Sequence, residues 1–383
     1  MVEILAPVGN FAMLNAAVNA GADAVYFGIQ GLNMRESAKN FTVEDLKEFP
    51  SSVKKYLALN TIIYDSELEK VKAVLLKVKD YIDAVICWDL AVVRIAKELG
   101  IDVHLSTQAS VANVEAIKMY KDLGVTRVIL ARELSLEQIK FIKDNVDIEI
   151  EVFIHGAMCV SYSGRCFLSQ DIFNRSANRG KCIQPCRRNY KIIDTELGHE
   201  LELGSQSILS AKDLCTMPFF EKILDLGVDG LKIEGRAKTP EYVDIVVRAY
   251  RRAVDEELTD ELKEELMKEL EKSYNRGFSS GFYLNEGSQF TKEEGNVSEI
   301  KKEQIGIVVN YYKEKGVAAL KLFGDLEKGD SLLVTGNKTG VVRTTVEDMQ
   351  IEHKKVEKAS KCLVAIKMDL VRENDKVFKI SKI

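Results

Sequence analysis

Eight short apolar runs, each followed by a helical pattern, are the feature that most limits what this chain can fold into. They are rich in Val, Ile and Leu and mostly lack polar alternation, which is typical of strands buried on both faces of a sheet. The runs occupy Ile4–Pro7, Ala24–Gly28, Leu57–Ile63, Asp83–Asp89, Asp102–Ser106, Arg127–Ala131, Ile148–Ile154 and Gly230–Glu234. Eight βα units with short connections predict an α/β fold, a closed (β/α)8 TIM-like barrel.

The main alternative to a closed barrel is an open, doubly wound sheet. Such sheets often carry a glycine-rich nucleotide signature directly after the first strand. This sequence has no GxGxxG after its first apolar run and no GxxxxGK[ST] at any position. The missing signatures favour the closed barrel.

The composition of the chain changes after the barrel. We assign residues 1–258 to the (β/α)8 barrel and residues 259–300 to a helix and polar linker, the helix covering Asp260–Ser273. Residues 301–383 form Val-, Ile- and Lys-rich runs separated by glycines. That pattern predicts a small C-terminal antiparallel β-barrel domain.

A long insertion interrupts the seventh βα unit, at about 155–213, and is far longer than a usual βα loop. It contains a predicted hairpin, Tyr190–Ile193 with Leu201–Leu203. Long insertions at the C-terminal ends of barrel strands build active sites, so we expect chemistry here.

Four of the seven cysteines lie in this insertion, at Cys159, Cys166, Cys182 and Cys186, with the spacing C-x6-C-x15-C-x3-C. Four thiolates suit an iron–sulfur cluster or a structural zinc ion. Zinc ligands usually pair as C-x2–4-C, and only the second pair here has that spacing. We therefore rank a cluster first, zinc second and separate buried thiols third. Cys215 is the nearest spare thiol and could replace one of the four.

Polar residues within or just after the apolar runs form a second constellation. In a barrel they converge on one mouth, although a third or more of such residues are ordinarily buried ion pairs or supports. Their mixture of Arg, Lys and carboxylate suits a small anionic substrate. The residues are Asn60, Asp89, Gln108, Arg132, Glu133, Glu151, Lys232, Glu234 and Arg236, and Arg35 lies in the glycine-rich continuation of the second run.

His155 precedes Cys159 by four residues, and a Cys–His nucleophile pair is one reading of this proximity. The other reading is that His155 orients the loop or contacts substrate. The sequence contains neither GxSxG nor HExxH, so a protease mechanism has little other support.

The formal net charge is −5, so any nucleic-acid binding must come from a local patch. Such a patch runs from Ile172 to Lys191, where two aromatic residues interrupt a stretch without acidic residues. It is either a solvated surface or an RNA or phosphate contact. Its basic residues are Arg175, Arg179, Lys181, Arg187, Arg188 and Lys191. The N-terminus does not resemble a signal peptide and no membrane span is expected, which favours a cytoplasmic protein without a membrane partner.

At these residues the sequence resembles the U32 peptidase family over nearly the whole chain. The most specific match is EVFIHGAMCVSYSGRCFLS, Glu151–Ser169, followed by GKCxxxCR from Gly180. Supporting matches are Ser106-x-Gln108, Arg132–Ser135 and Lys232–Arg236. The tail is similar to the translation-factor-like β-barrel of family members.

The resemblance implies two kinds of activity. The family name implies collagenase-type proteolysis. Several characterised members are instead oxygen-independent hydroxylases with a [4Fe–4S] cluster, which act on tRNA wobble uridine, 23S rRNA cytidine or ubiquinone precursors. The RNA-directed members use prephenate as co-substrate. In this chain the resemblance implies that the cluster ligands are Cys159, Cys166, Cys182 and Cys186.

The sequence therefore predicts a [4Fe–4S]-dependent, O2-independent hydroxylase of an RNA base, most similar to the tRNA branch that forms 5-hydroxyuridine. Glu133, Glu151 or His155 would handle protons. Substrate would contact Arg35, Asn60, Gln108, Arg132, Lys232, Glu234 and Arg236, and RNA would contact Arg175, Arg179, Lys181, Arg187 and Arg188. The alternatives are a U32-type peptidase and a non-catalytic, zinc-containing RNA-binding factor.

Overall fold

The computed structural model describes residues 2–30, 40–188, 190–203, 209–286, 289–291 and 295–382. Arg35 lies outside these residues. Each predicted apolar run forms a strand, although the third strand begins and ends earlier than predicted. The strands are β1 (Glu3–Pro7), β2 (Ala24–Phe27), β3 (Lys54–Ala58), β4 (Ala84–Cys87), β5 (Asp102–Leu105), β6 (Arg127–Ile129), β7 (Glu149–Gly156) and β11 (Gly230–Ile233).

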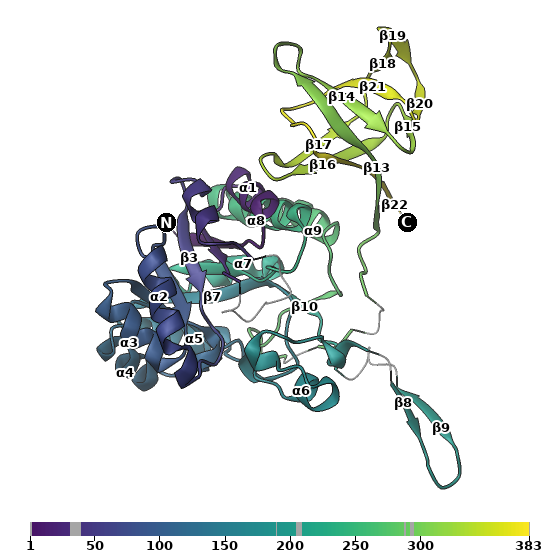
Figure 1. The fold of residues 1–383 in the computed structure, drawn as a ribbon. Helices are drawn as coiled ribbons and strands as arrows, with labels where there is room; N and C mark the ends of the chain where they lie inside the picture. Colours follow the sequence, from purple (N-terminus) through teal and green to yellow (C-terminus); the bar gives the residue numbers. More distant parts are fainter. Residues whose placement is uncertain are drawn as a thin grey trace.

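The eight parallel strands close into a barrel. They pair in sequence order from β1 to β7, and β11 pairs in parallel with both β1 and β7. Every residue of β1, β2, β4 and β11 is buried, which is why these runs lack polar alternation. The predicted (β/α)8 barrel is confirmed (Figure 1).

Helices alternate with the strands and cover the outside of the barrel. In several units the residue before the helix caps it: Asn10, Asp89, Asn113 and Ser135 each accept a backbone N–H from the first turn. Between β2 and β3 the described residues contain only a short 3-10 segment, Glu44–Glu48. The helices are α1 (Phe11–Asn19), α2 (Leu68–Val78), α3 (Leu90–Glu98), α4 (Val114–Asp122), α5 (Leu136–Asp144), α7 (Phe220–Leu224) and α8 (Pro240–Asp255).

The insertion between β7 and β11 contains a short helix, a hairpin and a returning strand. The helix is α6 (Leu168–Phe173). The predicted hairpin is confirmed as β8 (Tyr190–Ile193) paired with β9 (Glu200–Leu203). The chain then returns through β10 (Asp213–Cys215), which pairs antiparallel with β7 and in parallel with β12 (Phe278–Ser279). This pairing ties the end of the insertion to the strand from which it starts.

The C-terminal region is antiparallel, as predicted, and follows the charged helix α9 (Asp260–Glu271). Its main sheet encloses an apolar core of its own, separate from the barrel core. In sheet order the strands are β17 (Gly340–Thr345), β16 (Ser331–Gly336), β22 (Lys376–Lys382), β13 (Ile300–Tyr312), β14 (Val317–Leu322), β21 (Leu363–Lys367), β18 (Met349–Ile351) and β19 (Lys354–Val356). A second sheet pairs β15 (Asp325–Glu327) with β20 (Lys358–Ser360).

This region packs on α1 and α8 of the barrel (Figure 1). Ala16 of α1 forms a small apolar cluster with Leu333 and Val341. The side chain of Asn15 donates to the backbone carbonyl of Asn337 at 2.7 Å. These contacts involve the helical ring and not the C-terminal ends of the barrel strands. None of the helices among the described residues has the length and apolarity that a membrane crossing requires.

A matched pair of glycine variants tests the packing of the C-terminal region on α1. Gly340 and Gly316 both have positive φ, of 73° and 62°, so alanine strains the backbone at either position. A Cβ on Gly340 would also lie 2.7 Å from the backbone nitrogen of Ala16, whereas a Cβ on Gly316 would meet nothing within 4 Å. Gly340→Ala should therefore lower the free energy of unfolding by about 1–3 kcal/mol more than Gly316→Ala, measured by denaturant unfolding. Equal losses would contradict the close packing on α1.

Candidate active site

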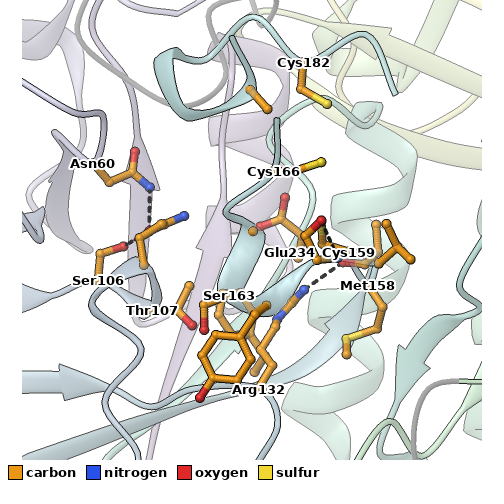
Figure 2. Close-up of a pocket in the computed structure, with 18 of the residues that line it drawn as sticks. Asn60, Ser106, Thr107, Arg132, Met158, Cys159, Ser163, Cys166, Cys182 and Glu234 are labelled. Atoms are coloured by element: carbon orange, nitrogen blue, oxygen red, sulfur yellow. Dashed lines mark hydrogen bonds between the residues drawn. The ribbon is translucent and has the colours of Figure 1, made fainter. Parts of the chain in front are cut away.

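A cavity of about 310 Å³ opens where the C-terminal ends of the barrel strands meet the insertion. Figure 2 shows Asn60, Ser106 and Arg132 around it, with Cys166 and Cys182 on the segment that borders it. Most residues predicted for the site line this cavity. They are Asn60, Gln108, Arg132, Glu133, Lys232, Glu234 and Arg236, together with Cys159, Cys166, Cys182 and Cys186.

The four cysteines are free thiols at the rim of the cavity. In three of them the sulfur accepts the backbone N–H of the residue two positions later: Cys159 from Ser161 at 3.5 Å, Cys166 at 3.3 Å and Cys182 at 3.4 Å. Burial raises the pKa of Cys186, Arg187 opposes that rise, and the other three thiols add to it. The four sulfurs therefore lie near enough to influence one another electrostatically.

A thiolate-binding metal group fits this donor set, because four soft ligands come from one loop beside a cavity. The N–H···S bonds fix the orientation of three of the four sulfurs. Over the part of the chain that the structure describes, no three His, Cys, Asp or Glu side chains are grouped closely enough to hold a single metal ion. The chemistry of the four thiols therefore supports binding of a metal group. The described side chains do not form a complete coordination shell for a single metal ion.

Cys215, the spare thiol of the sequence, lies elsewhere. It is buried in the core on β10, where its sulfur is 3.9 Å from the hydroxyl of Tyr250 and 3.7 Å from the sulfur of Met267. Burial raises the pKa of Cys215 to about 12. It does not line the cavity that the other four thiols border.

The four cysteines lie on one segment, Cys159–Cys186, called the cysteine segment below. Two of its arginines attach it to the barrel. The guanidinium of Arg165 lies 4.7 Å from the ring centre of Trp88 and donates to the carbonyl of Gln108. Arg179 forms two hydrogen bonds with the carboxylate of Glu67, of 2.8 and 2.6 Å. Arg179 was predicted to contact RNA, but its guanidinium is used in this internal ion pair. The sequence could not reveal the pair because Glu67 lies more than a hundred residues away.

The other predicted RNA-binding residues separate into two groups. Arg175, Lys181 and Arg188 are exposed, and Arg188 lies over the ring of Phe173 at 4.5 Å. Arg187, directly beside Arg188, points the other way. It lines the cavity and donates to the carbonyl of Met158 at 3.0 Å.

The side chain of His155 does not reach the cavity. Lys232 pairs with Phe153 and Ile233 with His155, so β7 holds one extra residue relative to β11 at this point. Such a bulge reverses the alternation of side chains. The ring of His155 therefore packs on the outer side of the strand, 5.7 Å from the ring of Tyr250 on α8. This geometry corrects the Cys–His pair, because the two side chains lie on different sides of the strand end.

Glu151 also lies away from the cavity, in the interior of the barrel. Its carboxylate binds Lys232 at 2.7 Å and Arg127 at 3.2 Å, and Arg127 also binds Glu3. All four charges are buried and satisfy one another. Glu151 is thus placed to hold Lys232 under the cavity and is out of reach for proton transfer to a ligand there.

The remaining polar groups converge on the cavity from the ends of four strands, β3, β5, β6 and β11. Glu133 follows β6 and accepts the backbone N–H of Ser163 in the cysteine segment at 2.9 Å. Arg132 stacks on the ring of Phe153 at 3.9 Å, and Lys232 lies 4.4 Å from the ring centre of Tyr26. Sequence reasoning missed Tyr26 and Phe153 as site residues. The only signal available was that each is an aromatic residue within a predicted barrel strand.

The family of the chain follows from its comparison with known proteins. The model of peptidase family U32 matches residues 9–293, which contain every barrel strand except β1 and all four cysteines of the cavity rim. The chain belongs to peptidase family U32.

Three relatives show how differently members of this family are described. An "uncharacterized protease" of Methanocaldococcus jannaschii is 44% identical over 99% of this chain and 98% of its own length. A "collagenase" of Porphyromonas gingivalis is 40% identical over 99% and 98%. The "tRNA hydroxylation protein P1" of Bacillus subtilis is 39% identical over 66% of this chain and 63% of its own length.

The position of His155 predicts a pH dependence of stability. Burial, aided by the charge of Lys238, lowers the pKa of His155 to about 3, against about 6.5 in an unfolded chain. Because the folded pKa is the lower one, this stabilisation is complete above pH 6.5 and is lost as the pH falls toward 3. Between pH 7.5 and pH 5 the contribution of His155 to the free energy of unfolding should fall by about 2 kcal/mol.

The variant His155→Gln should lose about 2 kcal/mol less than the wild type over that interval, measured by denaturant unfolding at the two pH values. His104, which is also buried and held neutral, is present in both proteins and cancels in the difference. The same loss in both proteins would contradict a neutral, buried His155.

Proposed function

We propose that this chain is an oxygen-independent hydroxylase of an RNA base, with tRNA wobble uridine as substrate and prephenate as co-substrate. The observation that carries the proposal is the placement of four cysteine thiols on the rim of a cavity whose wall presents arginine, lysine and glutamate. The relative named as a tRNA hydroxylation protein supports RNA as the substrate class.

In this proposal Cys159, Cys166, Cys182 and Cys186 hold a [4Fe–4S] cluster, with zinc as the alternative occupant. A bound cluster would supply one-electron chemistry at the rim of the cavity. The protein would keep that group beside the substrate through the two fastenings of the segment, Arg165 on Trp88 and Arg179 on Glu67. Preorganised geometry of this kind lowers the cost of bringing the reacting groups together.

The cavity wall supports binding of a small carboxylate. Arg132 and Arg236 line the cavity and offer guanidinium groups, which bind carboxylates through two parallel hydrogen bonds. Lys232 is buried at the same wall, and its charge is largely balanced by Glu151. We therefore assign the carboxylate contacts to the arginines and give Lys232 a supporting role.

Proton transfer is assigned to Glu133. It is a predicted acid–base residue whose side chain lines the cavity, whereas Glu151 and His155 point elsewhere. Its hydrogen bond with the backbone of Ser163 holds the carboxylate beside the cysteine segment. A carboxylate in this position can accept a proton from a substrate within hydrogen-bond reach.

RNA would approach along the exposed face of the cysteine segment. Arg175, Lys181 and Arg188 remain exposed there, while Arg179 and Arg187 are turned inward. Three exposed cations can contact the phosphate backbone and position a flipped base over the cavity.

The second candidate is a peptidase. It is favoured by the names of two relatives that match nearly the whole length of this chain. A cysteine peptidase needs a base within hydrogen-bond reach of its nucleophile. His155 does not supply it, because its ring packs against Tyr250 behind β7. The hydroxylase is therefore the better match to the geometry.

Mass spectrometry of tRNA and rRNA nucleosides from a strain lacking the gene tests the proposal. 5-Hydroxyuridine or its derivatives should disappear from tRNA and return with the wild-type gene. They should not return with Cys182→Ala or Glu133→Gln, while Lys118→Ala, a variant of an exposed lysine on α4, should restore them fully. An unchanged nucleoside profile in the deletion strain would overturn the proposal. Cleavage of a defined peptide by purified protein, abolished by Cys159→Ala, would favour the peptidase.

A further inference from the structure

Buried polar atoms without hydrogen-bond partners gather beside the cysteine segment. Within the described residues they include Nε and Nη2 of Arg132, Nη1 of Arg187, Nζ of Lys238 and both carboxylate oxygens of Asp213. Nearly all buried polar groups in proteins have a partner. Several unsatisfied donors in one place therefore indicate a group that these residues are built to bind.

The two arginines hold neighbouring points of one backbone turn. Arg132 donates through Nη1 to the carbonyl of Ala157 at 2.9 Å, and Arg187 donates through Nη2 to the carbonyl of Met158 at 3.0 Å. Both guanidinium groups line the cavity (Figure 2 shows Arg132 reaching the backbone beside Met158). The unpartnered atoms, Nε and Nη2 of Arg132 and Nη1 of Arg187, are buried and belong to side chains that line the same end of the cavity, next to the rim cysteines.

The orientation of Arg132 is fixed further by the ring of Phe153, on which its guanidinium stacks at 3.9 Å. A planar, stacked guanidinium loses little freedom when it binds a planar carboxylate or a phosphate. The bond to Met158 restricts Arg187 in a similar way. Both donors are thus held in place before a ligand arrives.

Behind the arginines lies a charge cluster centred on Asp213, which is only 1% exposed. Lys238 and Arg276 approach its carboxylate to 3.7 and 3.8 Å, which is ion-pair distance but too long for hydrogen bonds. Arg187 and Arg132 also act on Asp213 electrostatically. Asp213 thus faces four cations, and Glu234 is a second carboxylate that acts on Lys238. The cations still outnumber these carboxylates, which in a buried setting favours an added anion.

We propose that Arg132 and Arg187 form a two-guanidinium clamp for one oxyanion group, a carboxylate or a phosphate, at the end of the cavity beside the cysteine segment. Asp213 is a positioning residue that keeps the clamp and Lys238 in place. This assigns Arg187 to the small-molecule site and not to the RNA surface. The inference rests on the proposed function in that the clamped group would belong to the anionic co-substrate.

The adjacent arginines supply a matched test. Purified protein, with any resident metal group retained, is titrated by calorimetry with malonate, with inorganic phosphate and with a short single-stranded RNA. Arg187→Gln and Arg132→Gln should each weaken malonate binding roughly 10- to 100-fold, which is the usual effect of losing a charged hydrogen bond. Arg188→Gln, which changes the exposed neighbour, should leave malonate binding within about twofold and weaken RNA binding.

Two further variants separate the clamp from its support. Arg187→Lys keeps the positive charge but loses the planar guanidinium that can donate two parallel hydrogen bonds. Its affinity for malonate should therefore lie between those of the wild type and Arg187→Gln. Asp213→Asn should weaken malonate binding with no loss of RNA binding. Phosphate competing with malonate in the wild type would identify a general oxyanion site, and binding of malonate alone would identify a carboxylate site. Both results support the clamp.

Unchanged malonate binding in both Arg187→Gln and Arg132→Gln would overturn the inference. So would a loss of RNA binding in Arg187→Gln with malonate binding intact, because Arg187 would then serve the RNA surface. These measurements involve no turnover. An unchanged nucleoside profile in the deletion strain would therefore not contradict the clamp. Unchanged malonate binding in the arginine variants would contradict the clamp and leave the hydroxylase proposal to the nucleoside analysis.

Discussion

The parallel pairing of β11 with β7 is the constraint on which the rest of the site depends. It closes the barrel across the roughly seventy residues between Gly156 and Gly230, which include the insertion and α7, and so brings the insertion over the mouth. The same pairing sets Lys232 opposite Phe153 inside the barrel. The bulge that follows turns His155 outward and starts the cysteine segment at the cavity edge. One pairing therefore decides which side chains of β7 and β11 can meet a ligand.

A buried charge network supports this pairing from within. Glu3, Arg127, Glu151 and Lys232 come from four different strands and neutralise one another in the barrel interior. Removing one member of such a network leaves an uncompensated buried charge, which typically costs 3–5 kcal/mol. The Nζ of Lys232 is consequently held beneath the cavity at a fixed position. The same network explains why Glu151, although in the most specific sequence motif, is structural.

The sequence predicted the barrel well because each strand is a continuous apolar run, and continuous burial leaves a clear pattern. The third strand shows the limit: it begins at Lys54, and its two leading lysines hid that start. The rim cysteines and seven of the polar mouth residues were found because strand ends converge in any closed barrel. Their convergence is a property of the fold and needs no detailed contact.

The features that could not be predicted depend on contacts between distant residues or on backbone irregularity. Nothing in the local sequence around His155 marks the bulge that reverses its direction. Arg179 and Arg187 are indistinguishable from Arg175 and Arg188 by composition. Contacts with distant residues turn them inward: Glu67, Ile62 and Tyr64 for Arg179, and the carbonyl of Met158 for Arg187. The packing of the C-terminal sheet on α1 likewise rests on residues more than three hundred positions apart.

The proposed function depends on an iron–sulfur cluster held by the four thiols on the cavity rim. Mössbauer and EPR spectroscopy of anaerobically purified protein, together with iron and zinc analysis, would detect such a cluster. We expect a [4Fe–4S] signal that is lost on replacing Cys159, Cys166, Cys182 or Cys186 by alanine. That signal should persist in Cys362→Ala, which changes a thiol of the C-terminal region. Stoichiometric zinc without iron would show that the four thiols hold zinc and not a cluster.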